Sequence, residues 1–204
     1  MGRICILDYG SGNTRSVFNL FSSVAEDVVI SNAAADIACA SHIVLPGVGA
    51  FAAAMRKIRD TLPMEVLEEA VMGAKKPFLG ICVGMQVMAT QGREFGECDG
   101  LGWIPGRVEQ MATDGLPLPH VGWNNVTSHG STPLTDGLGD APDFYFVHSF
   151  AFKPECAEHA IATTEYGERF CSVVRKENLF GVQFHPEKSQ RTGIRLVKNF
   201  LALS

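Results

Sequence analysis

One cysteine of this 204-residue chain stands in a setting suited to nucleophilic chemistry. The surrounding sequence reads Pro-Phe-Leu-Gly-Ile-Cys-Val-Gly-Met-Gln, so that Cys82 lies between Gly80 and Gly84. An apolar, β-prone run precedes the cysteine and a helix-prone run follows it. This pattern is typical of a sharp strand-to-helix turn that holds a nucleophile above the end of a sheet. A buried core cysteine is the alternative, because most free thiols are packed in this way.

A thiolate nucleophile needs a base, and His185 is the best candidate among the six histidines. It ends an apolar strand-like run and is followed by Pro186 and Glu187. In an extended segment, side chains two residues apart project to the same side. We therefore expect Glu187 to accept a hydrogen bond from one ring nitrogen and to turn the other toward Cys82. A purely structural histidine at a strand end is the alternative.

Backbone amides near the cysteine could stabilise negative charge on a substrate oxygen. The first free amide of the helix after Cys82 belongs to Val83, and the Pro-Gly-Val-Gly run at 46–49 could offer a second from Val48 or Gly49. Two converging amides form an oxyanion hole. The same run half-matches a dinucleotide-binding fingerprint. It lacks the acidic residue expected about 20 positions later, so nucleotide binding is not favoured.

Two polar side chains that follow the cysteine could contact a substrate. Gln86 lies one turn after Cys82 on the same helix face, where its amide could hydrogen-bond a bound molecule. Glu94 lies near the end of that segment and could meet a substrate ammonium group. A solvated helix surface is the alternative for both, and the residues alone favour it for Glu94. The other histidines and the six cysteines show no metal-ligand spacing, so we expect no metal.

The elements that must position these residues alternate in the first half of the chain. Strand-like runs occupy 3–8, 27–30, 41–45 and 77–81, and helix-like runs occupy 13–24, 51–60 and 64–74. Apolar strands that alternate with helices predict a parallel sheet covered by helices on both faces. In such folds the sites form outside the carboxyl ends of the strands.

The second half has the pattern of a strand-rich extension. Strand-like runs occupy 101–111, 121–127, 144–150, 160–165, 169–175 and 179–185, and an amphipathic helix is expected at 190–203. The Lys-Glu-Asn run at 176–178 indicates a hairpin. Because no linker or repeat interrupts the pattern, we predict a single domain over 1–204, with an α/β fold and an antiparallel extension in the C-terminal half.

Composition describes an ordinary globular protein. The formal net charge of −5 gives no electrostatic reason to expect nucleic acid or an anionic membrane as partner. No apolar run approaches the roughly 18 residues that a membrane span needs. The N-terminus carries no export signal, and the scattered cysteines form no disulfide framework. These observations lead us to expect a cytoplasmic protein without membrane or nucleic-acid partners.

The cysteine turn, the His-Pro-Glu run and the Pro-Gly-Val-Gly loop together resemble the class I, or triad, glutamine amidotransferases. In that family the cysteine attacks the side-chain amide of glutamine, which gives a γ-glutamyl thioester and ammonia. Finer motifs extend from Leu-Asp-Tyr-Gly-Ser-Gly-Asn at residue 7 to Gln-Phe-His-Pro-Glu-Lys-Ser-Gln, which ends at residue 190. They are similar to one branch of the family, the glutaminase subunits of imidazole glycerol phosphate synthase in histidine biosynthesis.

This resemblance implies a flavodoxin-like open sheet, no cofactor, and a set of residue roles. The roles are nucleophile for Cys82, acid and base for His185, orienting carboxylate for Glu187, oxyanion donors for Val48, Gly49 and Val83, glutamine binding for Gln86, Glu94 and Ser149, and a partner-facing position for Trp123, Tyr145 and Lys188. The implied partner is a (β/α)8-barrel cyclase subunit, which forms a heterodimer and uses the ammonia to make imidazole glycerol phosphate and an aminoimidazole carboxamide ribotide. The two glycines of the 46–49 loop further suggest that glutaminase activity is weak until this partner binds.

Two alternatives stay open at this point. The chain could be a related glutaminase that supplies a different synthase, such as the one that makes pyridoxal phosphate. It could also be a non-enzymatic flavodoxin-like scaffold that uses Cys82 as a redox sensor. The His-Pro-Glu-Lys-Ser run argues against the sensor, because a sensor thiol has no use for an imidazole and carboxylate pair.

Overall fold

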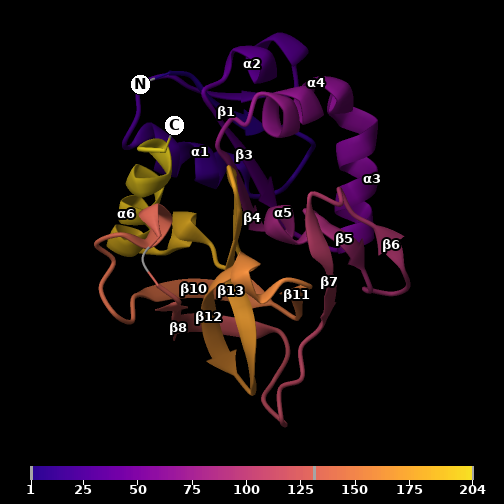
Figure 1. Cartoon of the computed structure of the whole chain (residues 1–204), viewed down its shortest axis with the longest axis vertical. Helices are drawn as coiled ribbons and strands as arrows, with labels where there is room; N and C mark the ends of the chain where they lie inside the picture. Colours follow the sequence, from indigo (N-terminus) through magenta and orange to yellow (C-terminus); the bar gives the residue numbers. More distant parts are fainter. Residues whose placement is uncertain (1, 131, 204) are drawn as a thin grey trace.

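The computed structural model describes residues 2–130 and 132–203, which form three β-sheets and the helices around them (Figure 1). The largest sheet has eight strands in the order β2-β1-β3-β4-β14-β13-β12-β9. Its strands are β1 (Ile4–Leu7), β2 (Val28–Ser31), β3 (His42–Gly47), β4 (Phe78–Cys82), β9 (Thr127–Ser128), β12 (Ala160–Tyr166), β13 (Glu168–Lys176) and β14 (Leu179–Val182). The four-stranded sheet has the order β11-β7-β5-β6, and the two-stranded sheet pairs β10 with β8. Their strands are β5 (Ala89–Gly92), β6 (Cys98–Asp99), β7 (Ile104–Gln110), β11 (Phe150–Pro154), β8 (His120–Asn125) and β10 (Asp143–His148).

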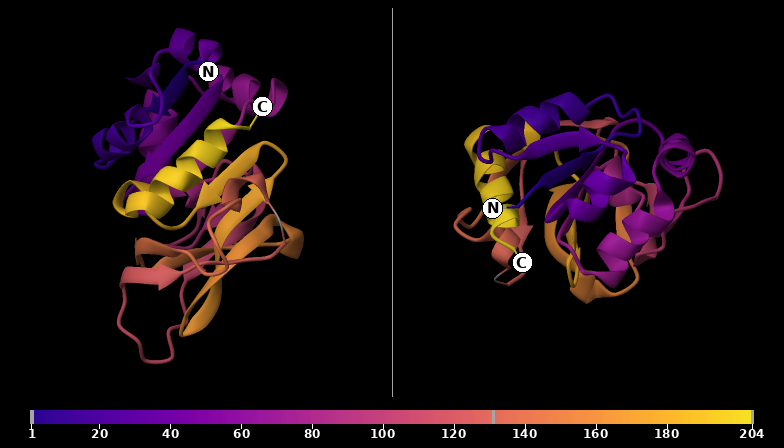
Figure 2. Two further views of the ribbon diagram at one scale, coloured as in Figure 1. Left: turned by 90° about the vertical axis from the view of Figure 1, so that its left-hand side faces the viewer. Right: turned by 90° about the horizontal axis from the view of Figure 1, so that it is seen from above.

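Helices cover both faces of the parallel half of the large sheet (Figure 2). They are α1 (Thr14–Ser22), α2 (Ala34–Cys39), α3 (Phe51–Thr61), α4 (Met64–Glu68), α5 (Val83–Gln86) and α6 (Gln190–Leu201), with a π-helical turn η1 (Glu69–Gly73) and the 3-10 turns η2 (Pro133–Thr135), η3 (Ala157–His159) and η4 (Pro186–Lys188). The helices α1 and α6 meet on one face, where the rings of Phe21 and Phe200 lie 6.4 Å apart. The chain has the mixed α/β fold with an antiparallel extension that the sequence predicts.

The parallel strands are buried on both faces, which explains their continuous apolar sequences. All residues of β1, β3, β4 and β14 are buried. These four strands pair in parallel with one another, β1 with β3, β3 with β4 and β4 with β14. The strand β14 is the boundary of the two halves, because it pairs in parallel with β4 and antiparallel with β13. The carboxyl end of β4 therefore lies beside the residues that follow β14, although about 100 positions separate them in the chain.

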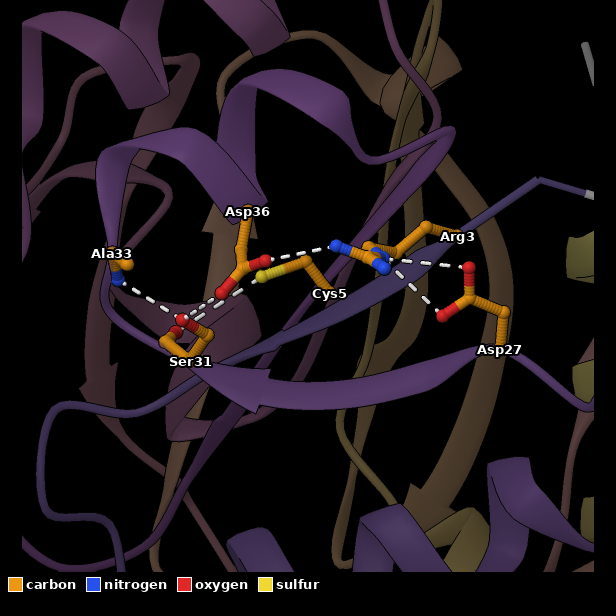
Figure 3. A network of polar contacts seen from close by, with 6 residues as sticks. All are labelled: Arg3, Cys5, Asp27, Ser31, Ala33 and Asp36. Carbon is orange, nitrogen blue, oxygen red and sulfur yellow. Dashed lines mark hydrogen bonds and ion pairs between the residues drawn. The ribbon is translucent and has the colours of Figure 1, made fainter.

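The edge strand β2 is only half-buried, and polar contacts attach it to its neighbours (Figure 3). The Arg3 guanidinium lies 3.2 Å from Asp27, just before β2, and 3.0 Å from Asp36 in α2. The hydroxyl of Ser31 donates to the same Asp36 carboxylate over 2.7 Å. We call Arg3, Asp27, Ser31 and Asp36 the edge cluster. It joins β1, β2 and α2 at the outer end of the sheet.

Several predicted elements differ in the structure. The helix after Cys82 contains only four residues, and 89–92 forms a strand instead, because it pairs in parallel with β7. Pro46 and Gly47, which were predicted as loop, are the last residues of β3. The pairing of β3 with β1 ends at Val44, so no backbone amide is needed at Pro46 to donate a hydrogen bond to β1. The strands β6 and β11 and the helix α2 were not predicted. The short helix α2 was missed because its six residues carry little apolar periodicity.

Two kinds of feature are absent from the described residues. Within residues 2–130 and 132–203, no helix combines the length and the apolar character needed to cross a membrane. Across the same two stretches, no group of three or more His, Cys, Asp and Glu side chains is arranged to hold a metal ion.

Candidate active site

Cys82 is the last residue of β4, and α5 begins at the next residue, so that it occupies a sharp, strained strand-to-helix turn. Its φ of 55° and ψ of −112° lie in a region that non-glycine residues rarely adopt. The flanking glycines are required by close backbone contacts. A methyl group at Gly84 would overlap the carbonyl oxygen of Leu45, and one at Gly80 would lie 2.5 Å from the carbonyl oxygen of Gly84. The turn therefore has the geometry that the sequence predicts.

His185 and Glu187 form a buried pair at the same end of the sheet. The Nδ1 atom of His185 lies 2.8 Å from Oε1 of Glu187, and the two side chains are 1% and 0% exposed. The predicted hydrogen bond is present, and His185 has the predicted extended backbone, but the prediction that this conformation continues to Glu187 is wrong. Strand β14 ends at Val182, and Pro186 begins the 3-10 turn η4, closed by a bond from the Lys188 amide to the His185 carbonyl of 3.0 Å. Pro186 suits the first position of such a turn because its φ is already fixed.

The Glu187 carboxylate has a second donor that the sequence analysis missed. The Nδ2 amide of Asn13 donates to Oε1 over 3.1 Å, and Ser11 donates to the other end of the Asn13 amide over 2.9 Å. Asn13 is buried in the Gly-rich turn that follows β1. Its place at a strand's carboxyl end was a signal, but nothing local connects it to a carboxylate 174 positions away.

Burial and charge act in opposite directions on this pair. Burial disfavours the imidazolium, but interactions with Cys82 and Glu187 prevail and raise the pKa of His185 to about 10. Burial likewise disfavours the carboxylate, yet the hydrogen bonds and charge of His185, together with Asn13, hold the pKa of Glu187 below its ordinary value. The pair is therefore an imidazolium and a carboxylate at neutral pH. Such a group can give a proton to a leaving group and take one from water.

A cavity of about 540 Å³ brings most of the predicted site residues together. Its walls include Val48, Gly49, Cys82, Val83, Gln86, Glu94, Ser149 and His185. Glu187 lies behind His185, where it contacts the imidazole but does not line the cavity. The volume is in the range of small-molecule sites.

The amide of Gln86 is used differently from the expectation. Its Nε2 donates to the Phe150 carbonyl and to Oε1 of Gln183, each over 3.0 Å. Gln183 in turn donates to the Cys82 sulfur over 3.7 Å. Both donors of Gln86 are thus engaged, which leaves its carbonyl oxygen to face a ligand. Gln183 was not singled out, because its contact with the cysteine depends on the pairing of β4 with β14.

Glu94 does not lie on a solvated helix surface, which the residues alone favoured. It follows β5 in a loop, and its Oε2 accepts a hydrogen bond of 2.8 Å from the Phe51 amide at the start of α3. A carboxylate is well placed at the positive end of a helix. This contact fixes Glu94 in the cavity wall, where it can meet a cationic group.

The loop that was predicted to donate an amide has a fixed base and a free tip. The Tyr9 hydroxyl donates to the Pro46 carbonyl over 2.8 Å, whereas Val48 is 40% exposed. Gly49 has a φ of 92°, a conformation that favours glycine, and a Cβ built there would have no neighbour within 4 Å. The peptide at 48–49 therefore has room to turn beside Val83.

Trp123, Tyr145 and Lys188 lie outside the cavity and form one exposed cluster, which we call the aromatic face. The rings of Trp123 and Tyr145 are 6.0 Å apart across the β8–β10 pair, and the Lys188 ammonium lies 5.4 Å from the centre of the Tyr145 ring. This face adjoins the site directly, because the Tyr145 carbonyl accepts a hydrogen bond of 2.8 Å from the His185 amide.

Comparison with known proteins gives a consistent result. Residues 5–203 match the family described as "Glutamine amidotransferase class-I". The chain is 43% identical to the "Imidazole glycerol phosphate synthase subunit HisH" of Bdellovibrio bacteriovorus, over 97% of this chain and 98% of that one. It is 46% identical to the protein of the same name from Salinibacter ruber, over 97% and 93% of the two chains.

Solved structures share the fold at low sequence identity. One is described as a putative GMP synthase protein from Thermoplasma acidophilum, with a TM-score of 0.73 and 18% identity over 98% of this chain and 92% of that one. Another, described as a glutamine amidotransferase, has a TM-score of 0.75 and 17% identity over 98% and 97% of the two chains. At these identities the likeness concerns the fold alone.

Proposed function

The chain belongs to the class I glutamine amidotransferases, and we propose that it is the glutaminase subunit of an imidazole glycerol phosphate synthase in histidine biosynthesis. In this role it hydrolyses glutamine to glutamate and ammonia and delivers the ammonia to a cyclase subunit. The narrower assignment is supported by the relatives of 43% and 46% identity, which carry that name and match nearly from end to end.

One observation carries the chemistry. Cys82 in its strained turn and His185, which is hydrogen-bonded to the buried Glu187 behind it, border the same cavity, which is what nucleophilic attack on an amide requires. In the proposed first step, the Cys82 sulfur forms a bond to the side-chain amide carbon of glutamine. His185 gives its proton to the nitrogen as the carbon–nitrogen bond breaks, so that ammonia leaves and a thioester remains.

The second step reverses the role of the imidazole. The neutral His185 takes a proton from water, and the resulting hydroxide attacks the thioester carbon. Glutamate leaves as the carbon–sulfur bond breaks, and the thiolate and imidazolium are restored. Glu187 supports both steps, because its carboxylate fixes the ring orientation and stabilises the positive imidazolium.

Two sets of backbone and side-chain groups would hold the glutamine. The amides of Val83 and of the 48–49 peptide are proposed to stabilise the oxyanion, and the free tip of that loop explains why the second amide could be withdrawn. Glu94 is proposed to pair with the substrate ammonium, and Gln86 to present its carbonyl oxygen. Ser149 and the adjoining backbone complete the wall.

The aromatic face is proposed to meet the partner, a (β/α)8-barrel cyclase that forms a heterodimer with this chain. Trp123 is 48% exposed and its neighbour Val121 on the same strand face is 56% exposed. Aromatic side chains are enriched at the centres of protein–protein interfaces. Because this face is hydrogen-bonded to the His185 backbone, we propose that partner binding activates a weak resting glutaminase.

The test is a glutamine hydrolysis assay with the wild type, Cys82→Ala and the exposed-thiol control Cys39→Ala. Each is measured alone and with the cyclase and its ribotide ligand. We expect turnover by the wild type and Cys39→Ala that rises with the partner, and none by Cys82→Ala. Turnover in Cys82→Ala would contradict the nucleophile assignment. Ammonia transfer only to a pyridoxal phosphate synthase would contradict the histidine assignment and leave the glutaminase intact.

A further inference from the structure

Two buried histidines behind the cavity have no part in the reaction described above. His120 begins β8 and His148 ends β10, and they face each other as a cross-strand pair on the buried side of these strands. The Nδ1 atom of His120 lies 3.2 Å from the Nε2 atom of His148. Of the two, His148 also forms part of the cavity wall.

The contact between His148 and the Phe150 carbonyl determines which ring nitrogens of the pair carry protons. The Nδ1 atom of His148 lies 2.9 Å from the carbonyl oxygen of Phe150, which can only accept a hydrogen bond. His148 must therefore carry its proton on Nδ1. In a neutral ring the Nε2 atom is then an acceptor, so the proton between the two rings belongs to Nδ1 of His120.

The contact between Asn124 and His120 leads independently to the same assignment of the protons. The Nδ2 amide of Asn124 lies 3.3 Å from Nε2 of His120. The orientation of this amide is fixed, because Nδ2 also donates to the Glu165 carbonyl over 3.0 Å and the side-chain oxygen accepts from the Asn125 amide over 2.8 Å. Nε2 of His120 must accept, which again leaves its proton on Nδ1. Both rings are therefore neutral. His120 donates its hydrogen bond to His148, and His148 donates its own to the Phe150 carbonyl.

The surroundings keep the pair neutral. His120 is stacked on Tyr166 with ring centres 4.0 Å apart and on Phe146 at 5.0 Å. Burial lowers the pKa of His120 to about 4. Burial, with smaller effects of the neighbouring His120 and His185 rings, lowers the pKa of His148 to about 3.

The pair ends on a backbone segment that faces the substrate cavity. The Phe150 carbonyl accepts two hydrogen bonds, from His148 and from Nε2 of Gln86. The preceding carbonyl, of Ser149, accepts one of 3.0 Å from the Met111 amide. Both peptide planes around Phe150 are thus held, and the Gln86 side chain is held with them. Removing the His148 donor would leave the Phe150 carbonyl with Gln86 as its single side-chain donor, so that this peptide plane and the Gln86 side chain are held less firmly.

We propose that His148, supported by His120, is a positioning residue for glutamine binding, which acts by fixing the Phe150 carbonyl and through it Gln86 and the backbone at 149–150. Neither ring moves a proton in the reaction. This inference rests on the proposed glutaminase function. It goes beyond it by assigning a role to a histidine pair that the catalytic mechanism leaves unused.

Two variants of His148 separate positioning from packing. The Nδ2 atom of an asparagine occupies the place of Nδ1 in histidine, whereas the longer glutamine places its nitrogen near Nε2. His148→Asn therefore keeps the donor to Phe150, and His148→Gln removes it. The exposed His129, whose ring is hydrogen-bonded to the Thr163 hydroxyl, provides the control variant His129→Gln.

The measurement uses a glutamine analogue with a γ-electrophile that alkylates Cys82, because its inactivation kinetics separate binding (KI) from chemistry (kinact) without a partner. We expect KI to rise about 10-fold in His148→Gln and to stay within about 3-fold of wild type in His148→Asn and His129→Gln. The value of kinact should change less than about 3-fold in all of them, because Cys82 and His185 are untouched. An unchanged KI in His148→Gln, or an equal rise in the asparagine variant, would overturn the inference.

A second measurement does not depend on activity. Nitrogen-15 spectra of the wild-type imidazoles at pH 7 should show His120 and His148 neutral, each with its proton on Nδ1. A proton on Nε2 in either ring would overturn the inference. Failure of the proposed function looks different: the wild type would turn over no glutamine and react with no analogue, whatever the proton positions.

Discussion

The edge cluster and the catalytic pair use similar chemistry in opposite surroundings. In the edge cluster, Arg3 lies 3.2 and 3.0 Å from two carboxylates, and the three side chains are 39%, 50% and 31% exposed. In the catalytic pair, His185 and Glu187 lie 2.8 Å apart and are 1% and 0% exposed. The distances differ little, so burial must account for the difference in behaviour.

Water decides what each cluster can do. Around Arg3, solvent screens the charges and competes for the hydrogen bonds, so the contacts mainly fix β2 and α2 in place (Figure 3). Around His185, water is excluded, and the proton affinity of each group is set by its neighbour. A short ion pair is therefore no guide to function unless its burial is known. Substitutions in the two clusters can test this contrast, beginning with the largest expected effect.

Removing the imidazole should abolish the reaction. We expect His185→Gln to lower kcat for glutamine hydrolysis by about 1,000-fold or more, because the proposed mechanism needs this imidazole to protonate the leaving ammonia and to take a proton from water. The matched change in the edge cluster, Arg3→Gln, should leave kcat within about 2-fold of wild type. Comparable losses in the two variants would remove the distinction between the clusters.

Removing the charge of the buried carboxylate should have the next largest effect. In Glu187→Gln the ring loses its partner anion, and we expect kcat to fall by about 100- to 10,000-fold. Because the carboxylate raises the pKa of His185, this variant should also show the imidazole titrating at lower pH by NMR. A His185 titration that does not move would contradict the assigned cause of the shift.

The pair should also make stability depend on pH. The folded pKa of His185, about 10, lies above its ordinary value of 6.5, so its contribution is complete below pH 6.5 and is lost as pH rises toward 10. Urea unfolding of Cys82→Ala, in which no thiol titrates beside the imidazole and Glu187 still raises the pKa of His185, should show stability falling between about pH 7.5 and 8.5, by at most roughly 1.4 kcal/mol per pH unit. The slope should flatten when His185→Gln is added.

Above about pH 7.5 the buried His42, His120 and His148, whose folded pKa values are lowered, are neutral in the folded and in the unfolded chain, so they no longer change the slope. Burial raises the pKa of Cys5 and of Cys171 to about 12, from an ordinary value of 9, so these thiols add to the loss only at higher pH. A slope that persists unchanged when His185→Gln is added would show that another group is responsible.

Losing the second donor to the carboxylate should have a smaller effect. Asn13→Ala leaves Glu187 with one hydrogen bond of the two it receives, and we expect kcat to fall about 10-fold. Asn13→Asp would place a second negative charge against the carboxylate and should be worse than alanine. Equal activity of the alanine variant and wild type would show that Asn13 does not act on the pair.

The smallest effect is expected at the edge. Asp36→Ala removes one of the two carboxylates that Arg3 contacts, and the other remains. We expect the Tm to fall by a few degrees at most, with the difference shrinking in high salt and with unchanged glutamine turnover. A large loss of stability would mean that exposure does not weaken this cluster as argued.

Local patterns in the sequence were enough to predict the turn at Cys82 and the hydrogen-bonded pair of His185 and Glu187 that the structure contains. The turn around Cys82 and the bond between His185 and Glu187 depend on neighbours within four residues, so their residue types and spacing reveal them. The apolar strands β1, β3 and β4 were recognisable for the same reason, since burial on both faces demands continuous apolar sequence. The single domain over 1–204 stays a prediction, which one cooperative unfolding transition would support.

Contacts between distant segments could not be found in this way. Asn13 reaches Glu187, and Gln183 reaches Cys82, only because the order of the strands brings them together. The sequence did not reveal that α5 ends after four residues, because the segment that follows it looks helical. That segment forms β5 instead, since its pairing with β7 overrides the helical preference. The histidine pair was overlooked because its significance lies in the register of β8 against β10.

The backbone bond between Tyr145 and His185 has a practical consequence. The Tyr145 amide also receives support from that turn, since it donates to the Ser189 hydroxyl over 3.0 Å. The strand β10, which carries Tyr145, and the segment 185–189, which carries His185, are therefore linked by two hydrogen bonds and should move together. Attempts to graft this protein onto a foreign synthase would do best to vary the side chains of Val121 and Trp123 on the adjoining strand. Insertions or deletions in β10 would displace His185 together with Tyr145.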